Sequence, residues 1–154
     1  MSDRAVSPVL GVILLVALTV ITAGVIALFV TELPDMREPP VVTMEGTVNA
    51  SDNTLTIVHT GGDSIAVDEL ALHVTVDEEP LTYQPPVPFE SARGYSTGPS
   101  GPLHSWGSST WEPGEESRLQ LAGSNEPLPT AESRVAVEIT YADTPIAELS
   151  LTHE

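Results

Sequence analysis

The chain has 154 residues, which suits one hydrophobic segment plus one small domain, so no second catalytic domain is expected. Its formal net charge is −17, with 22 acidic residues, 5 arginines and no lysine. Phosphate binding requires a basic patch, so this composition excludes nucleic acid as a partner. Cysteine is absent, which excludes disulfides and thiol chemistry.

The acidic residues are concentrated in the downstream part of the chain, because all of them except Asp3 lie beyond residue 31. Disorder is the simplest interpretation of such a charge, but the same region keeps an apolar alternation that disordered chains lack. A folded domain with this charge repels itself in dilute buffer, whereas molar salt shortens the Debye length to about 3 Å. Acid-rich, lysine-free surfaces resemble those of salt-loving archaea.

Residues 6–30 form an uncharged apolar stretch, VSPVLGVILLVALTVITAGVIALFV. At about 1.5 Å per residue, a helix of this length crosses a hydrocarbon core of about 30 Å. Arg4 lies just before the stretch and the acidic bulk after it, which places the N-terminus in the cytoplasm and the rest outside. Pro8 is expected in the first turn of the helix, and Leu33-Pro34 is expected to stop it. An ordinary secretory signal has a shorter apolar region.

The sequence DRA at residues 3–5, followed by VSPVLGVIL at residues 6–14, closely resembles the start of haloarchaeal type IV pilins. In that family a membrane aspartic peptidase cuts ahead of the apolar stretch, after a small residue preceded by a charged one. The resemblance therefore implies cleavage between Ala5 and Val6, with Arg4 as the charged residue and residues 1–5 as the leader. Bacterial type IV pilins carry a glutamate where this chain has Leu10, so pairing of that charge is not implied here.

The resemblance implies a structural subunit of a surface filament for adhesion and cell–cell contact, polymerising through its hydrophobic helix after leader cleavage. The implied partners are copies of itself, other pilins, the prepilin peptidase, an assembly ATPase and a membrane platform protein. Before assembly the subunit would be a single-pass membrane protein with its C-terminal domain outside. No cofactor is implied. The alternative is a membrane-anchored exported binding module that does not polymerise.

Small residues interrupt the apolar stretch and would let neighbouring helices approach closely. The opposing interpretation is that Gly and Ala are simply common in membrane helices. The candidate packing residues of this core helix are Pro8, Gly11, Ala17, Ala23, Gly24 and Ala27.

The rest of the chain predicts an α+β protein, in which the helix at residues 6–32 and a linker at 33–40 precede an acidic antiparallel β-sandwich at 41–154. Alternating or β-branched runs mark the expected strands, which cover residues 41–48, 54–60, 66–76, 117–122, 134–141 and 146–152. Turn signals separate these runs, including one at residues 142–145 that predicts a C-terminal hairpin. No further helix is expected.

Residues 80–113 interrupt the strand pattern with seven prolines and predict a long surface loop. Two interpretations of its aromatic residues remain open. They contact a neighbouring subunit or an external surface, or they cap the sandwich. The residues concerned are Tyr83, Phe89, Tyr95, Trp106 and Trp111.

No pattern for catalysis or metal binding is evident. The four histidines lack the close spacing of zinc motifs, so no metal site is expected. Adjacent carboxylates follow from the acidic composition, and no glycine-flanked nucleophile or phosphate loop occurs, so an enzyme is not expected. Asn49-Ala50-Ser51 is a complete N-glycosylation sequon in a segment predicted to lie outside the cell, which makes Asn49 a glycosylation candidate.

Overall fold

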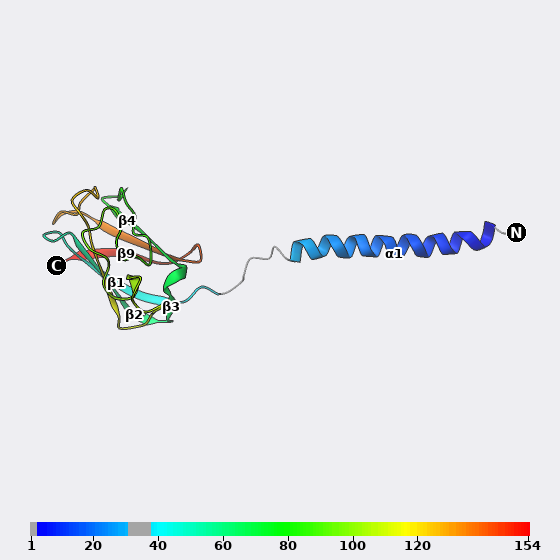
Figure 1. Ribbon diagram of the computed structural model, residues 1–154, viewed down its shortest axis with the longest axis horizontal. Coiled ribbons are helices and arrows are strands. Elements are labelled where there is room, and N and C mark those ends of the chain that lie inside the picture. The colour runs from blue at the N-terminus through cyan, green and yellow to red at the C-terminus, as the bar shows by residue number, and fades with distance from the viewer. Residues whose placement is uncertain (1–2, 31–37) are drawn as a thin grey trace. The chain divides into compact units, whose positions relative to one another are not determined.

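The computed structural model describes residues 3–30 and 38–154, and the chain divides into two compact units, Met1–Glu38 and Pro39–Glu154 (Figure 1). The first unit contains the helix α1 (Asp3–Val30), and the second contains all of the strands. The predicted α+β class, a long apolar helix followed by a mostly antiparallel β-domain, is confirmed. The predicted helix end at Leu33-Pro34 and the linker residues 33–37 lie outside the described residues, as do Met1 and Ser2 of the leader.

Helix α1 begins earlier than expected. Because its first residue is Asp3, Pro8 lies inside the helix rather than in its first turn. Proline has no N–H, so the carbonyl of Arg4, four residues earlier, receives no helical hydrogen bond from it. The expectation of a first-turn proline is therefore wrong for the uncleaved chain.

The β-domain is built mainly from six longer strands, three shorter ones and two short 3-10 helices. The longer strands are β1 (Val42–Asn49), β2 (Thr54–Gly62), β4 (Leu70–Val76), β7 (Glu116–Gln120), β8 (Val135–Tyr141) and β9 (Thr144–His153). The shorter elements are β3 (Ile65–Ala66), β5 (Glu79–Pro80), β6 (Thr110–Trp111), η1 (Val67–Glu69) and η2 (Gly101–Leu103). The predicted C-terminal hairpin is present as β8 and β9, and residues 38–154 contain no α-helix.

The longer strands and β5 form one hydrogen-bonded sheet in the order β5-β4-β8-β9-β1-β2-β7. Its two halves are joined only at the end of β9, where Thr152 and His153 pair in parallel with Thr47 and Val48 of β1. All other ladders in this sheet are antiparallel. The halves surround one hydrophobic core, to which β2, β4 and β8 each contribute alternate buried residues.

The predicted strand at residues 66–76 is wrong in its first part. Ile65 and Ala66 pair with β6, whereas Leu70 to Val76 pair with β8, and the helix η1 lies between the two segments. Apolar residues on both sides of Asp68 and Glu69 suggest one strand, but the two parts of the run find hydrogen-bond partners in different sheets. Pairing with different, distant strands therefore explains why η1 interrupts the predicted strand.

Loop residues bond to the outer strand β7 and to the part of β4 that β5 leaves unpaired. On β7, the N–H of Ser100 donates to the carbonyl of Arg118 at 3.0 Å, and the Ser100 hydroxyl accepts from the Arg118 N–H at 3.1 Å. On β4, the Gln84 amide bonds both the N–H and the carbonyl of Val74, at 2.7 and 2.9 Å. Open strand edges promote pairing with other chains, so these loops protect the domain from sheet extension at these places.

Candidate functional site

The first candidate element is the apolar part of α1. Residues Ser7–Phe29 are long enough and apolar enough to cross a membrane, judged by length and composition. Every side chain in this range is exposed. The hydroxyl of Thr19 donates to the Val16 carbonyl at 2.8 Å, and that of Thr22 donates to the Leu18 carbonyl at 2.9 Å. Polar groups in hydrocarbon need internal partners, so these two threonines are compatible with a lipid or helix-bundle environment.

The residues of the predicted cleavage site all lie within the first helical turns. Arg4, Ala5 and Val6 belong to α1, and Pro8 follows two residues later. Cleavage before Val6 would make Pro8 the third residue of the chain. The missing N–H of proline is tolerated at that position, because N–H groups of a first turn have no helical partner.

The small residues of α1 do not form one group. With about 100° of rotation per residue, Ala17, Ala23, Gly24 and Ala27 fall within an arc of about 120°. Gly11 and Pro8 fall outside this arc. An added Cβ at Gly11 or Gly24 would meet no atom within 4 Å, so nothing in the described chain requires glycine at either position. Any requirement for glycine there must come from a neighbouring molecule.

Asn49 lies at the end of β1 and starts the turn into β2. Its Oδ1 accepts the N–H of Ser51 at 3.0 Å and that of Asp52 at 3.3 Å, and its side chain is half-buried. The amide carbonyl therefore shapes the turn. Ser51, the hydroxyl residue of the sequon, is exposed.

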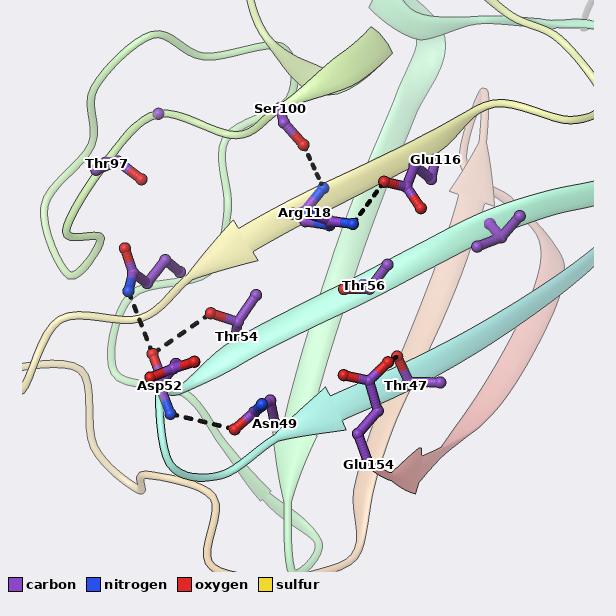
Figure 2. Close-up of a pocket in the computed structure, with 13 residues that line it drawn as sticks. Thr47, Asn49, Asp52, Thr54, Thr56, Thr97, Ser100, Glu116, Arg118 and Glu154 are labelled. Atoms are coloured by element: carbon purple, nitrogen blue, oxygen red, sulfur yellow. Dashed lines mark hydrogen bonds and ion pairs between the residues drawn. The ribbon is translucent and has the colours of Figure 1, made fainter.

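A polar groove, which we call the outer groove, covers β1, β2 and β7 beside this turn (Figure 2). It has a volume of about 640 Å³. Arg118 lies over it in an ion pair of 2.8 Å with Glu116, and the Thr47 hydroxyl donates to Glu154 at 3.2 Å (Figure 2). The remaining polar lining consists of Asn49, Asp52, Thr54, Thr56, Thr97, Ser100 and Gln120. Sequence reasoning missed this groove, although the alternate threonines of β2, Thr54 and Thr56, were its signal.

Four of the five aromatic residues of the 80–113 segment divide into two sets, while Tyr83 is half-buried with the Arg93 guanidinium 4.8 Å from its ring centroid. Phe89, Tyr95 and Trp111 are buried in the core, so for them the capping interpretation is correct. The rings of Phe89 and Tyr95 are 5.1 Å apart, and the Tyr95 hydroxyl donates to the Tyr83 carbonyl at 3.0 Å. Burial raises the pKa of Tyr95 above its ordinary value, so this phenol stays neutral. Trp106, in contrast, is exposed.

His59 is fully buried and has its own structural role. One ring nitrogen, Nε2, lies 3.1 Å from the Gly61 carbonyl, and the ring meets Trp111 edge-on with centroids 6.3 Å apart. The other nitrogen, Nδ1, has no hydrogen-bond partner among the described residues. Nor do the described residues include any cluster of three His, Cys, Asp or Glu side chains that would hold a metal ion.

Comparison with known proteins finds a family match in the N-terminal region. Residues 4–44, from α1 to the start of β1, match the family model described as archaeal type IV pilin, N-terminal. An uncharacterized protein of Archaeoglobus fulgidus is 40% identical over 81 residues, which are 51% of this chain and 57% of that protein. The match thus spans little more than half of that relative.

Among solved structures, the archaellum periplasmic stator protein FlaG from Sulfolobus acidocaldarius superposes with a TM-score of 0.43 and 14% sequence identity. The superposition covers 71% of this chain and 97% of that one. The family match at residues 4–44 includes the predicted cleavage residues Arg4, Ala5 and Val6.

Proposed function

We propose that this protein is a structural subunit of an archaeal type IV pilus-like surface filament. In this proposal α1 is held in the membrane before assembly and forms the filament core afterwards, and the acidic β-domain faces outward. The observation that carries the proposal is the match of residues 4–44 to the archaeal type IV pilin N-terminal model, on a helix whose apolar side chains from Ser7 to Phe29 are exposed.

Assembly of such a helix requires little free energy for leaving the membrane. Identical apolar helices replace the acyl chains around it, so the environment of its side chains stays apolar. The arc of Ala17, Ala23, Gly24 and Ala27 supports close approach of two helices, because small side chains let backbones come together. The partners in this proposal are copies of the chain and other pilins, with an assembly ATPase and a membrane platform protein driving extraction.

Cleavage between Ala5 and Val6 by a prepilin peptidase is the processing step in this proposal. It would remove Arg4, whose charge would otherwise enter an apolar bundle at a cost of several kcal/mol. The new α-amino group has an ordinary pKa near 8 and loses its proton far more easily than arginine. Cleavage would also turn Pro8 from an interior residue of α1 into a first-turn residue. The missing hydrogen bond of an interior proline would then no longer weaken the helix.

The β-domain, in this proposal, determines what the filament touches. Its surface is acidic, its edges on β4 and β7 are covered by loops, and Asn49 offers a site for glycan attachment. Adhesion or cell–cell contact is therefore assigned to this domain rather than to α1.

N-terminal sequencing of the wild-type protein purified from whole cells tests the processing step. The expected sequence begins at Val6, and Ala5→Leu should leave the full chain in the membrane fraction, because a bulky residue replaces the small one before the cut. Ser2→Ala, outside the motif, is the matched control and should be processed normally. A wild-type protein that begins at Met1 or Ser2 would reject the filament subunit in favour of a membrane-anchored module that does not polymerise.

Polymerisation itself is tested at Gly24. Gly24→Leu fills the small-residue arc, while Val20→Leu adds one methylene on the same face and serves as the control. We expect Gly24→Leu to be processed and membrane-inserted but to yield few filaments in sheared material seen by electron microscopy. Normal filament yield from Gly24→Leu would show that this arc makes no close helix contact.

A further inference from the structure

Trp106 is an unusual surface residue. It is 81% exposed, whereas the other tryptophan of the chain, Trp111, is fully buried. Within residues 38–154, Val41 is the other strongly exposed large hydrophobic residue. A tryptophan on the surface adds nothing to the core, and tryptophans are enriched among the residues that dominate binding energy. Its exposure therefore points to a contact with a ligand.

The local structure holds the Trp106 side chain in place. Its indole N–H donates to Glu90 Oε2 at 3.1 Å, and its backbone N–H donates to Nδ1 of His104 at 3.1 Å. The next residue closes the turn, since the Gly107 N–H donates to the His104 carbonyl at 2.8 Å. A ring oriented in this way loses little conformational entropy when a ligand stacks on it.

A hollow of about 400 Å³ lies beside this ring. Prolines and glycines form part of its wall, and polar groups come from Ser100, His104, Ser108 and Glu115. The Glu115 carboxylate accepts the Glu112 N–H at 2.8 Å, and a carboxylate has further lone pairs for other donors. The site thus combines one flat aromatic face with several hydrogen-bonding groups at its border.

We propose that Trp106 and this hollow bind a pyranose sugar. The C–H face of a sugar ring carries partial positive charge and fits the negative face of the indole, while its hydroxyls suit the carboxylates, imidazole and serine hydroxyls around it. The proposal concerns the β-domain alone and does not depend on filament assembly.

Other ligands fit the geometry less well. A stable protein interface covers about 800 Å² on each partner and has an apolar centre of several residues, whereas Trp106 stands alone among polar groups. Quaternary ammonium ligands are recognised by cages of several Trp, Tyr or Phe rings, and the lining here contains one such ring, that of Trp106.

The outer groove extends the site for a longer sugar chain. Both hollows are lined by Ser100, so they adjoin at this residue. The hydroxyl, amide and carboxylate side chains of the groove, including Thr54, Gln120 and Asp52, offer donors and acceptors to further hydroxyl groups. The sugar would come from an external polysaccharide or from a glycan on another copy of the chain.

Saturation-transfer NMR on the full chain tests the proposal. The chain is made in a non-glycosylating host and held in an amine-oxide detergent, which has no sugar headgroup. The probes are methyl pyranosides of glucose, galactose and mannose, together with N-acetylglucosamine, glucuronic acid and tetramethylammonium. Acrylamide quenching of tryptophan fluorescence is the second readout, because Trp106 is exposed and Trp111 is not.

We expect at least one pyranose to receive saturation on its C–H face and to protect the exposed tryptophan from acrylamide. Trp106→Ala should weaken binding about tenfold or more, and Trp106→Phe, which keeps a ring, should weaken it less. Val41→Ala is the matched control and should bind like the wild type. Transfer to no pyranose, equal transfer with Trp106→Ala, or protection by tetramethylammonium alone would overturn the proposal.

A second experiment identifies the source of the sugar. In filaments from the native host, Ser51→Ala removes the sequon but keeps the Asn49 side chain of the outer groove, and it should increase quenching of Trp106 if a glycan of another copy occupies the site. Unchanged quenching, with pyranose binding by the recombinant chain, assigns the site to an external polysaccharide.

Discussion

The helix α1 exposes its apolar side chains, whereas the β-domain buries most of its own. From Ser7 to Phe29 the helix exposes every side chain, while the β-domain buries a single core that includes Trp111, Leu55 and Ile139 at 0% exposure. The domain also covers the edges of β4 and β7 with its own loops. The domain thus has a core of its own, whereas the exposed apolar side chains of the helix need an apolar environment.

The difference indicates where association with other molecules belongs. A sheet with protected edges resists nonspecific pairing, so the β-domain is suited to face water and to bind selectively. A helix whose backbone and threonine hydroxyls are internally bonded is suited to hydrocarbon or to a bundle of like helices. The following predictions test or refine this division.

The largest effect is expected in the core of the β-domain. Trp111→Ala should lower its free energy of unfolding by about 3–5 kcal/mol, because the ring fills the interior and packs on His59. Leu14→Ala in α1 removes a side chain that is 69% exposed and should leave that free energy unchanged. Guanidinium unfolding, followed by the circular dichroism of the strands, measures the free energy of unfolding of both variants. A comparable loss in Leu14→Ala would mean that the domain depends on the helix.

The second prediction concerns a charge in α1. Leu18, near the middle of the apolar span, is replaced by arginine, which should disfavour membrane insertion by about 2.5–3.5 kcal/mol. Extraction of membranes with alkaline carbonate measures the inserted fraction, and unfolding of the β-domain should stay as in the wild type. Val41→Arg, an exposed position of the domain, is the control. Full membrane retention of Leu18→Arg would contradict a membrane-embedded α1.

The third prediction concerns salt. The β-domain should melt several degrees higher in about 3 M than in about 0.1 M potassium chloride, because its acidic side chains repel one another and salt screens them. Its ion pairs Arg118–Glu116 and Arg134–Glu78 are exposed and therefore offset little of this repulsion. Equal melting temperatures in the two solutions would reject the repulsion argument.

A single cross-strand pair offers a smaller test of the same repulsion. Glu138 on β8 lies directly opposite Glu148 on β9, and both side chains are exposed. Like charges at opposed positions destabilise a sheet, so Glu148→Arg should raise the unfolding free energy by about 0.2–1 kcal/mol in low salt. The gain should shrink in molar salt, and Glu148→Gln should give a smaller gain. A loss of stability in low salt would contradict the prediction.

The smallest effect is a pH dependence at Asp77. Its Oδ1 accepts the Arg134 N–H at 2.7 Å, and this bond, with a smaller contribution from the Ser133 hydroxyl, lowers the pKa of the carboxyl below its ordinary value. The folded state therefore binds this proton less readily than the unfolded state. The stabilisation is present above the unfolded pKa, near 3.8, and is lost as the pH falls through the folded pKa.

Asp77→Asn provides the control for this titration. Asparagine tolerates the positive φ of 52° at this position and keeps an oxygen acceptor, but it does not titrate. Acid unfolding curves of the two proteins should differ in slope below about pH 4. Identical slopes would show that the Asp77 hydrogen bond contributes no measurable linkage.

The contrast between local and distant interactions also explains what was predictable from the sequence. The helix was predictable because its hydrogen bonds are local and because no charged residue occurs between Arg4 and Glu32. The strands at residues 54–60 and 134–141 were predictable from alternation, since one side of each must face a core. The candidate cleavage motif and the sequon are likewise short continuous patterns that stand in the sequence itself.

Only the tertiary structure decided how distant segments meet. Trp106 and Trp111 lie five positions apart in the same proline-rich segment, yet one is exposed and the other fills the core. The outer groove needs Thr47, Thr54 and Arg118 from three strands, and its floor exists only because β1, β2 and β7 are neighbours. The break at η1 arises because β3 and β4 pair with different strands. Burial and pairing depend on contacts between residues far apart in the chain, and no local pattern specifies those contacts.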